Sequence, residues 1–136
     1  MDPGTLLATT HRAKDGLRVR LRLARPTDAL RMGAFIERLD PEAVARAFPP
    51  VPGAPDPVRR LTFFDPRRRV VLVATALLEG AETIVGVAEV ALTHPGVAVL
   101  ASVVDEAHRR RGIGTLLGDA IAALARRQGA VDLRAA

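Results

Sequence analysis

The chain has 136 residues, a formal net charge of +5 and a hydrophobic fraction of 49%, which is typical of one globular domain with one core. It contains no Cys, Trp or Tyr, which excludes disulfides, thiolate metal sites, cysteine nucleophiles and a tyrosine general acid. Lys14 is the only lysine among 20 basic residues. Arginine binds phosphate through a planar fork of donors, so this bias suits pyrophosphate as well as nucleic acid.

The first strand is predicted at residues 17–23, where leucine and valine alternate with arginine. This period of two is typical of a strand with one buried face. Residues 1–16 show no such pattern, and we expect them to form a flexible tail ahead of a domain at 17–136. The polar amino terminus and the absence of a long apolar run favour a cytoplasmic protein.

Two short helices are predicted next. Turn and cap residues at 26–28 precede apolar residues at helical spacing over 32–39, and a second helix is expected from Asp40 to Phe48. Residues 49–57 include five prolines and are therefore expected to form an extended loop without regular structure.

The second half of the chain predicts a run of strands, one long helix and a final strand fragment at 131–133. An antiparallel meander is expected from three β-rich apolar segments, 70–78, 83–92 and 97–104. An amphipathic helix follows from Ile113, and Gly129 ends it. The predicted fold class is α/β (α+β), with a mainly antiparallel mixed sheet flanked by helices.

The segment Val103–Leu117, VVDEAHRRRGIGTLL, carries the most chemical information. A buried strand ends here, an arginine run follows, and Gly112 and Gly114 open the long helix. A helix start offers unpaired N–H groups and the positive end of the dipole, and glycines let an anion approach them. The pattern predicts an anion site of the size of a pyrophosphate.

These residues resemble a signature of the Gcn5-related N-acetyltransferase (GNAT) family: Arg or Gln, two residues, Gly, one residue, then Gly or Ala. Here the signature is RRRGIG at Arg109–Gly114, after the fourth strand as in the family. LRLARPTDA near residue 25 is similar to the family's opening strand and helix. LTFFD (Leu61–Asp65) and the VVLVA strand resemble, more loosely, the GNAT domain of bacterial protein acetyltransferases. The resemblance covers about 17–133.

The resemblance implies an acyl-CoA-binding domain that transfers an acetyl group from acetyl-CoA, as co-substrate, to an amine by direct attack in a ternary complex. The acceptor would be a small molecule, a protein lysine or a protein N-terminus. No metal is implied, and the spacing of the three histidines suggests no metal site. The residues assigned to cofactor binding are Val103, Val104, Arg109, Arg110, Arg111, Gly112, Ile113, Gly114 and Thr115.

The catalytic residues are harder to assign. Family enzymes often carry a carboxylate on the fourth strand, and the corresponding residue here is Val99. Glu89 on the preceding strand is the only candidate base, with pairing to an arginine as its alternative role. The chain stops at Ala136, just after the family's fifth strand begins, so we expect a C-terminally short domain that lacks the family's tyrosine acid. A homodimer through the exposed C-terminal strand edge could complete it.

Three other functions remain open at this point. A truncated, non-catalytic CoA-binding or protein-interaction module is the main alternative. An NAD(P)-binding Rossmann-like fragment is suggested by the glycines and by Asp132 about twenty residues later, although position 117 holds Leu where the fingerprint wants a small residue. Nucleic-acid binding is suggested by the basic charge, but only 3% of residues are aromatic, which disfavours base stacking.

Overall fold

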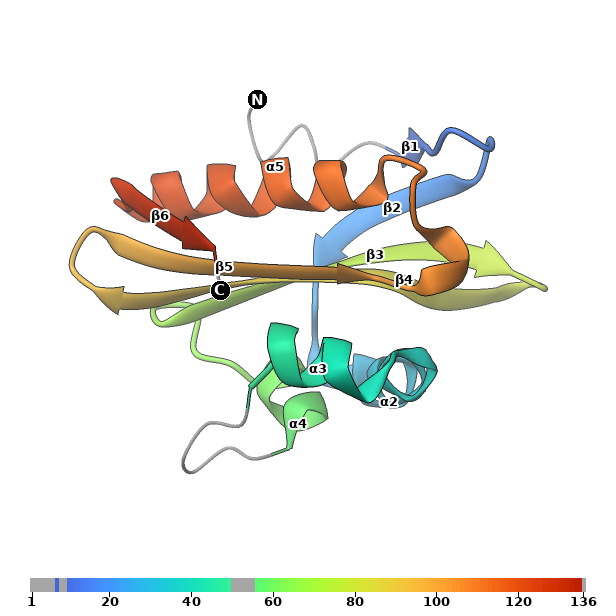
Figure 1. The fold of residues 1–136 in the computed structure, drawn as a ribbon, viewed down its shortest axis with the longest axis horizontal. Helices are drawn as coiled ribbons and strands as arrows, with labels where there is room; N and C mark the ends of the chain where they lie inside the picture. Colours follow the sequence, from blue (N-terminus) through green and yellow to red (C-terminus); the bar gives the residue numbers. More distant parts are fainter. Residues whose placement is uncertain (1–6, 8–9, 50–55, 136) are drawn as a thin grey trace.

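The computed structural model describes Leu7 and residues 10–49 and 56–135. Figure 1 shows a six-stranded sheet between two helical layers. The strands lie in chain order: β1 (Thr10–Arg12), β2 (Arg18–Leu23), β3 (Arg69–Leu78), β4 (Ala81–His94), β5 (Val97–Val104) and β6 (Asp132–Ala135). The helices are α2 (Ala29–Arg38), α3 (Pro41–Ala47), α4 (Pro57–Thr62) and α5 (Ile113–Arg127), with short 3-10 turns η1 (Pro26–Asp28) and η2 (Glu106–His108).

The sheet separates two cores. Because side chains alternate between the faces of a strand, Leu72 of β3 packs on the α5 side, whereas Val71 and Val73 pack on the side of α2, α3 and α4. Leu117 of α5 and Phe35 of α2 are fully buried in these respective cores. Figure 1 shows α5 on one face of the sheet and α2, α3 and α4 on the other.

The predicted α/β class with a mainly antiparallel mixed sheet is confirmed. Each of the first five strands pairs antiparallel with its neighbour, and only β5 and β6 are parallel. A Rossmann unit has an open, mostly parallel sheet. The expectation of a dinucleotide-binding fragment is therefore wrong at the level of the fold.

Two described segments differ from the sequence expectation. Part of the predicted tail, Thr10–Arg12, forms β1 and pairs with Arg18–Arg20 through a tight turn; a strand of three residues is too short to show a period. Of the loop expected at 49–57, residues 50–55 lie outside the described residues, and the last residue, Pro57, begins α4, a helix that was not predicted. Asp56 caps it by accepting a hydrogen bond of 3.0 Å from the Val58 N–H.

A buried ion network ties β2, β4 and the start of α2 together. The side chain of Asp28 is fully buried, and its oxygens accept hydrogen bonds from the Arg22 guanidinium at 2.6 and 2.7 Å. Arg22 also donates to Glu82 at 2.7 Å. Burial on its own would raise the pKa of Asp28, but hydrogen bonds from Arg22 and from the Arg25 N–H together outweigh it, so the pKa is lowered.

We expect Asp28→Asn to lower the free energy of unfolding at pH 7 by about 3 kcal/mol, because it breaks a buried pair on one side. The folded pKa is depressed, so the carboxylate stabilises the fold above its unfolded pKa of about 4 and loses this effect as the pH falls through the folded pKa. The difference in free energy of unfolding between wild type and variant, measured by urea unfolding, should therefore become smaller at acid pH. A difference in free energy of unfolding that stays constant down to about pH 2 would show that the ion pair does not provide this stability.

Candidate functional site

Half of one edge of β5 has no strand beside it among the described residues. β5 pairs with β4 along its length, but with β6 only from Val97 to Leu100. The Asp105 N–H donates to the Val85 carbonyl of β4 at 2.9 Å. Since backbone groups of successive residues point to opposite edges, those of Ser102 and Val104 face away from β4. The second half of β5 therefore presents an open edge.

A cavity of about 560 Å³ lies along this open edge. α3 and α5 contribute to its walls from the two faces of the sheet. Among the lining residues, Arg46 and Arg109 carry charge and Ser102 is the only hydroxyl; none of the described lining residues is a carboxylate.

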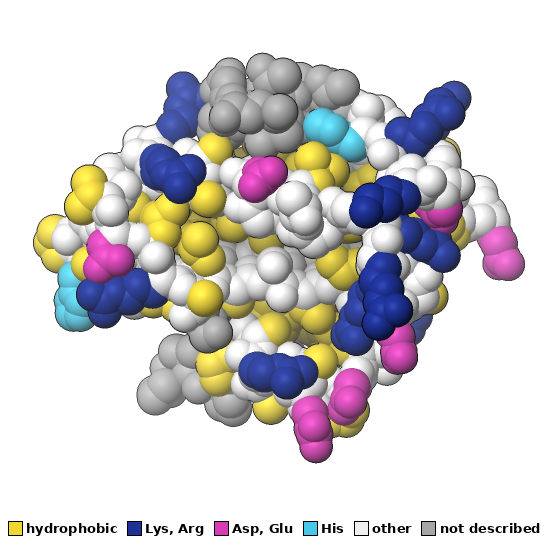
Figure 2. All heavy atoms as spheres, turned by 45° about the horizontal axis from the view of Figure 1, so that its top comes forward, with side chains coloured by type: hydrophobic (Ala, Val, Ile, Leu, Met, Phe, Trp, Pro, Cys, Tyr) yellow, Lys and Arg dark blue, Asp and Glu magenta, His cyan; other side chains and the backbone are white. Residues whose placement is uncertain are grey.

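Figure 2 views the molecule from the α5 side and shows Lys and Arg side chains gathered on the right, where the β1–β2 hairpin meets the start of α5.

The start of α5 lies at the end of this edge. Gly112 is the N-cap residue, with a φ of 89° that favours glycine. The first i to i−4 hydrogen bond of α5 is donated by the Leu116 N–H to the Gly112 carbonyl at 3.0 Å. The N–H groups of Ile113, Gly114 and Thr115 precede it and lack such an i−4 partner. These donors and the helix dipole can hold an anion.

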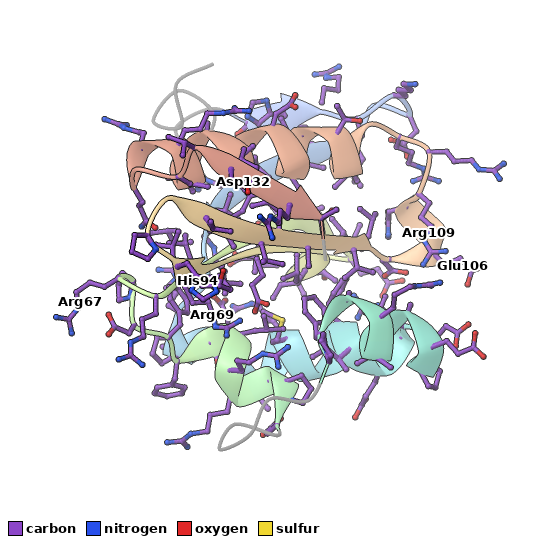
Figure 3. The ribbon with its side chains drawn as sticks, turned by 60° about the vertical axis from the view of Figure 1, so that its left-hand side comes forward. Arg67, Arg69, His94, Glu106, Arg109 and Asp132 are labelled. Atoms are coloured by element: carbon purple, nitrogen blue, oxygen red, sulfur yellow. The ribbon has the colours of Figure 1, made fainter. Side chains whose placement is uncertain are left out.

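The three arginines before Gly112 do not act as one cluster. Arg109 lines the cavity, and its Nε donates to the Val104 carbonyl at the open edge at 3.1 Å. Arg111 lies 2.5 Å from the Asp15 carboxylate, so it anchors the loop to the β1–β2 turn. Arg110 is exposed, with a φ of 64°. Figure 3 shows Arg109 beside η2, at the end of β5.

Three further contacts that the sequence did not predict hold this loop against the rest of the fold. Asp105 is buried, and its Oδ1 accepts from the Ala107 N–H at 3.2 Å, which caps η2. Its other oxygen lies 2.8 Å from the Arg38 Nε at the end of α2. Arg38 also donates to the Ile84 carbonyl at 2.7 Å. The strand end that leads to the anion site is thus held by the opposite helical layer.

Gly86 of β4 sets how closely α5 approaches the sheet. A Cβ at this position would lie 2.7 Å from Leu117 Cδ1 and 3.4 Å from Ile113 Cγ2, both in the first turns of the helix. Leu117 and Ile113 are themselves buried and have little room to move. The bare backbone of Gly86 therefore positions the start of α5.

We expect Gly86→Ala to destabilise the fold by about 1–3 kcal/mol, because the added methyl overpacks the contact with α5. Gly33→Ala is the matched control, since a Cβ at Gly33 in α2 meets nothing within 4 Å. The control should be neutral or stabilising, by up to about 1 kcal/mol. Equal effects of the two changes on chemical unfolding would contradict the role given to Gly86.

The candidate base Glu89 lies near the cavity but does not line it. It is on β4, opposite Ala101 of β5, and its side chain belongs to the face covered by α2, α3 and α4. Glu89 is 7% exposed, and its Oε2 lies 2.7 Å from Arg69 Nη1 and 3.8 Å from Arg60 Nε. The carboxylate is thus engaged by two guanidinium groups, which favours a structural role. Its assignment as the base stays a prediction.

The two roles of Glu89 give different outcomes. As a structural partner, Glu89→Gln should lower the free energy of unfolding by about 3 kcal/mol, because it leaves buried charge uncompensated. Arg69→Gln should also destabilise the fold, while leaving Glu89 chemically intact. If instead only Glu89→Gln abolishes acetyl transfer, and its stability in urea unfolding is unchanged, Glu89 is the base.

Two features have no candidate in the part of the chain that the structure describes: a cluster of metal ligands and a membrane-spanning helix. The described residues hold no group of three or more potential His, Asp or Glu ligands. None of the described helices is long and apolar enough to cross a bilayer.

Comparison with known proteins agrees with the fold. The profile of the acetyltransferase (GNAT) family matches residues 36–136. The GNAT domain of S. lividans PAT is similar over 93% of this chain and 76% of its own, with 29% identity and a TM-score of 0.75. No curated protein sequence matches the chain.

Two more distant structures share the fold alone. A cAMP-binding acyltransferase from Mycobacterium smegmatis has 22% identity and a TM-score of 0.61 over 96% of this chain, which spans only 40% of that protein. The enzyme AAC(6')-Iy, solved in complex with the bisubstrate analog CoA-S-monomethyl-acetylneamine, has 17% identity and a TM-score of 0.60. That match covers 87% of this chain and 78% of the enzyme.

Proposed function

Because the chain belongs to the acetyltransferase (GNAT) family, we propose that it binds acetyl-CoA and transfers the acetyl group to an amine. One observation carries this proposal: the open edge of β5 ends at Val104, beside the start of α5, although η2 separates the two in the sequence. A ligand with a peptide-like arm and a pyrophosphate needs these two features side by side. The cavity between α3, β5 and α5 supplies the space for it.

In the proposed complex the pyrophosphate lies against the N–H groups of Ile113, Gly114 and Thr115. A Cβ at Gly114 would lie 3.7 Å from Val104 Cγ2, which is an ordinary contact, so a larger side chain there would extend into the space between helix and strand. The amide groups of the pantetheine arm pair with the open edge at Ser102 and Val104. Val103 lines the cavity, but its backbone groups face β4, so Val104 is the better placed donor.

The proposed reaction is a direct transfer. The amine nitrogen bonds to the acetyl carbon, the carbon–sulfur bond breaks, and the thiolate of CoA leaves with the electron pair. The amine loses one proton, and the thiolate can accept one. Holding both substrates along one strand edge supplies much of the rate, and an edge N–H that donates to the thioester oxygen stabilises the charge that develops there.

A second candidate function is a CoA-binding module without turnover. It is favoured by the described cavity lining, which has no carboxylate to take the proton of the amine. Val99, which the resemblance aligns with the family's carboxylate, pairs with Ala91 of β4 and Arg134 of β6 and has no titratable group. An assay for free thiol over a panel of amines, including lysine peptides, separates the two functions: thiol released only with an amine indicates the enzyme, and binding without release indicates the module.

Binding itself is tested by a thermal-shift titration. Acetyl-CoA at about one hundred times its dissociation constant should stabilise the folded protein by about 2.7 kcal/mol. Gly114→Val should fold but lose this shift, because its side chain fills the space beside Val104. Gly33→Val is the matched control in α2 and should keep it. No shift with acetyl-CoA, or the same shift in both variants, would contradict the proposed site.

A further inference from the structure

A second groove, of about 1250 Å³, lies across β1, β2 and β3 and shares no lining residue with the cavity beside β5. It forms where two neighbouring strands diverge. β2 pairs with β3 only over Arg20–Leu23 and Leu72–Thr75. The preceding Arg18–Val19 continues beside β1, while Ala76–Leu78 continues beside β4. Each of these strand ends therefore has one edge on the groove.

The groove concentrates positive charge that no carboxylate among the described residues neutralises. Arg12 of β1 and Arg18 of β2 are direct cross-strand partners, so their side chains lie side by side on one face. Like charges in such a pair destabilise a sheet. Arg20 follows on the same face, and all three side chains are exposed, with no ion pair among the described residues. Glu82, the one carboxylate among the described lining residues, is already paired with Arg22.

The same groove exposes apolar side chains. Leu77 is 73% exposed and Leu23 is 48% exposed, and both line it. Arg18 and Arg20 are two residues apart on a strand, a spacing of roughly 7 Å. Alternate side chains of an extended peptide repeat at the same spacing, so carboxylates at every second position can meet successive arginines.

We propose that this groove binds an acidic segment of another protein in an extended conformation, with apolar residues among its carboxylates. The charge is complementary, the leucines accept the apolar side chains, and the diverging strand edges offer backbone groups for strand addition. Nucleic acid fits less well, because no Phe, Tyr or Trp among the described residues lines the groove for base stacking, and His11 is the one imidazole there. A second copy of this chain would bring together two surfaces rich in arginine. The proposal does not depend on acetyl transfer.

The probe is a fluorescein-labelled peptide of four Glu-Leu repeats. Its binding to the protein is measured by fluorescence anisotropy at low salt. Arg18→Glu should weaken its binding about tenfold or more, because it removes a charge partner and adds a repulsive one. Arg126→Glu is the control: Arg126 is exposed at the far end of α5, and the substitution changes the net charge equally. We expect it to leave the affinity within about twofold, because charge far from the groove is screened.

The fold of the test variant is checked by its melting temperature. Arg18→Glu should melt at or above the temperature of the wild type, because it replaces the repulsion with Arg12 by an attraction. Leu77→Ser should also weaken binding of the peptide, and this substitution leaves the net charge of the protein unchanged. If Arg18→Glu and Arg126→Glu weaken peptide binding equally, the binding is general charge attraction and the proposal is overturned. The absence of binding, or tighter binding of a single-stranded RNA octamer at the same arginines, would also overturn it.

Discussion

The incomplete pairing of β5 is the constraint from which the candidate site follows. A strand inside a sheet normally satisfies both of its edges. Here β4 takes one edge of β5 along its length, whereas β6 takes the other only as far as Leu100 among the described residues. The backbone groups beyond that point face a cavity rather than a strand. A ligand with amide groups can satisfy them, which a fully paired strand would not allow.

The open edge becomes useful because α5 begins at its end, and three contacts from different parts of the chain hold it there. The packing against Gly86 carries most of this constraint, since it lies in the interior. In the Asp105–Arg38 pair only the carboxylate is buried, because the Arg38 side chain is 37% exposed. The Arg111–Asp15 pair is half-exposed, and such pairs contribute only about 0–1 kcal/mol. The Arg111–Asp15 pair therefore orients the loop before α5 and adds little to the stability of the fold.

The sequence predicted local features well and long-range ones poorly. The alternation at 17–23 and the two glycines on either side of Ile113 are local signals, and the strand and the helix start are where they indicate. Asp56 and Pro57 repeat the cap-and-proline pattern of Asp40 and Pro41, so α4 could have been found by the same rule. The run Arg109–Arg111 predicts one phosphate cluster, yet the structure divides it, because the partner of Arg111 is almost a hundred residues away in the sequence. No spacing rule identifies such a partner.

Amide hydrogen exchange followed by NMR tests the role of the open edge most directly. In the free protein, the Val103 N–H, which faces β4, should exchange slowly, and the Val104 N–H should exchange faster because no described strand covers it. Saturating acetyl-CoA should slow the exchange of Val104 together with that of Ile113, Gly114 and Thr115. Exchange at Val104 that is already slow without ligand, or that acetyl-CoA leaves unchanged, would contradict the account.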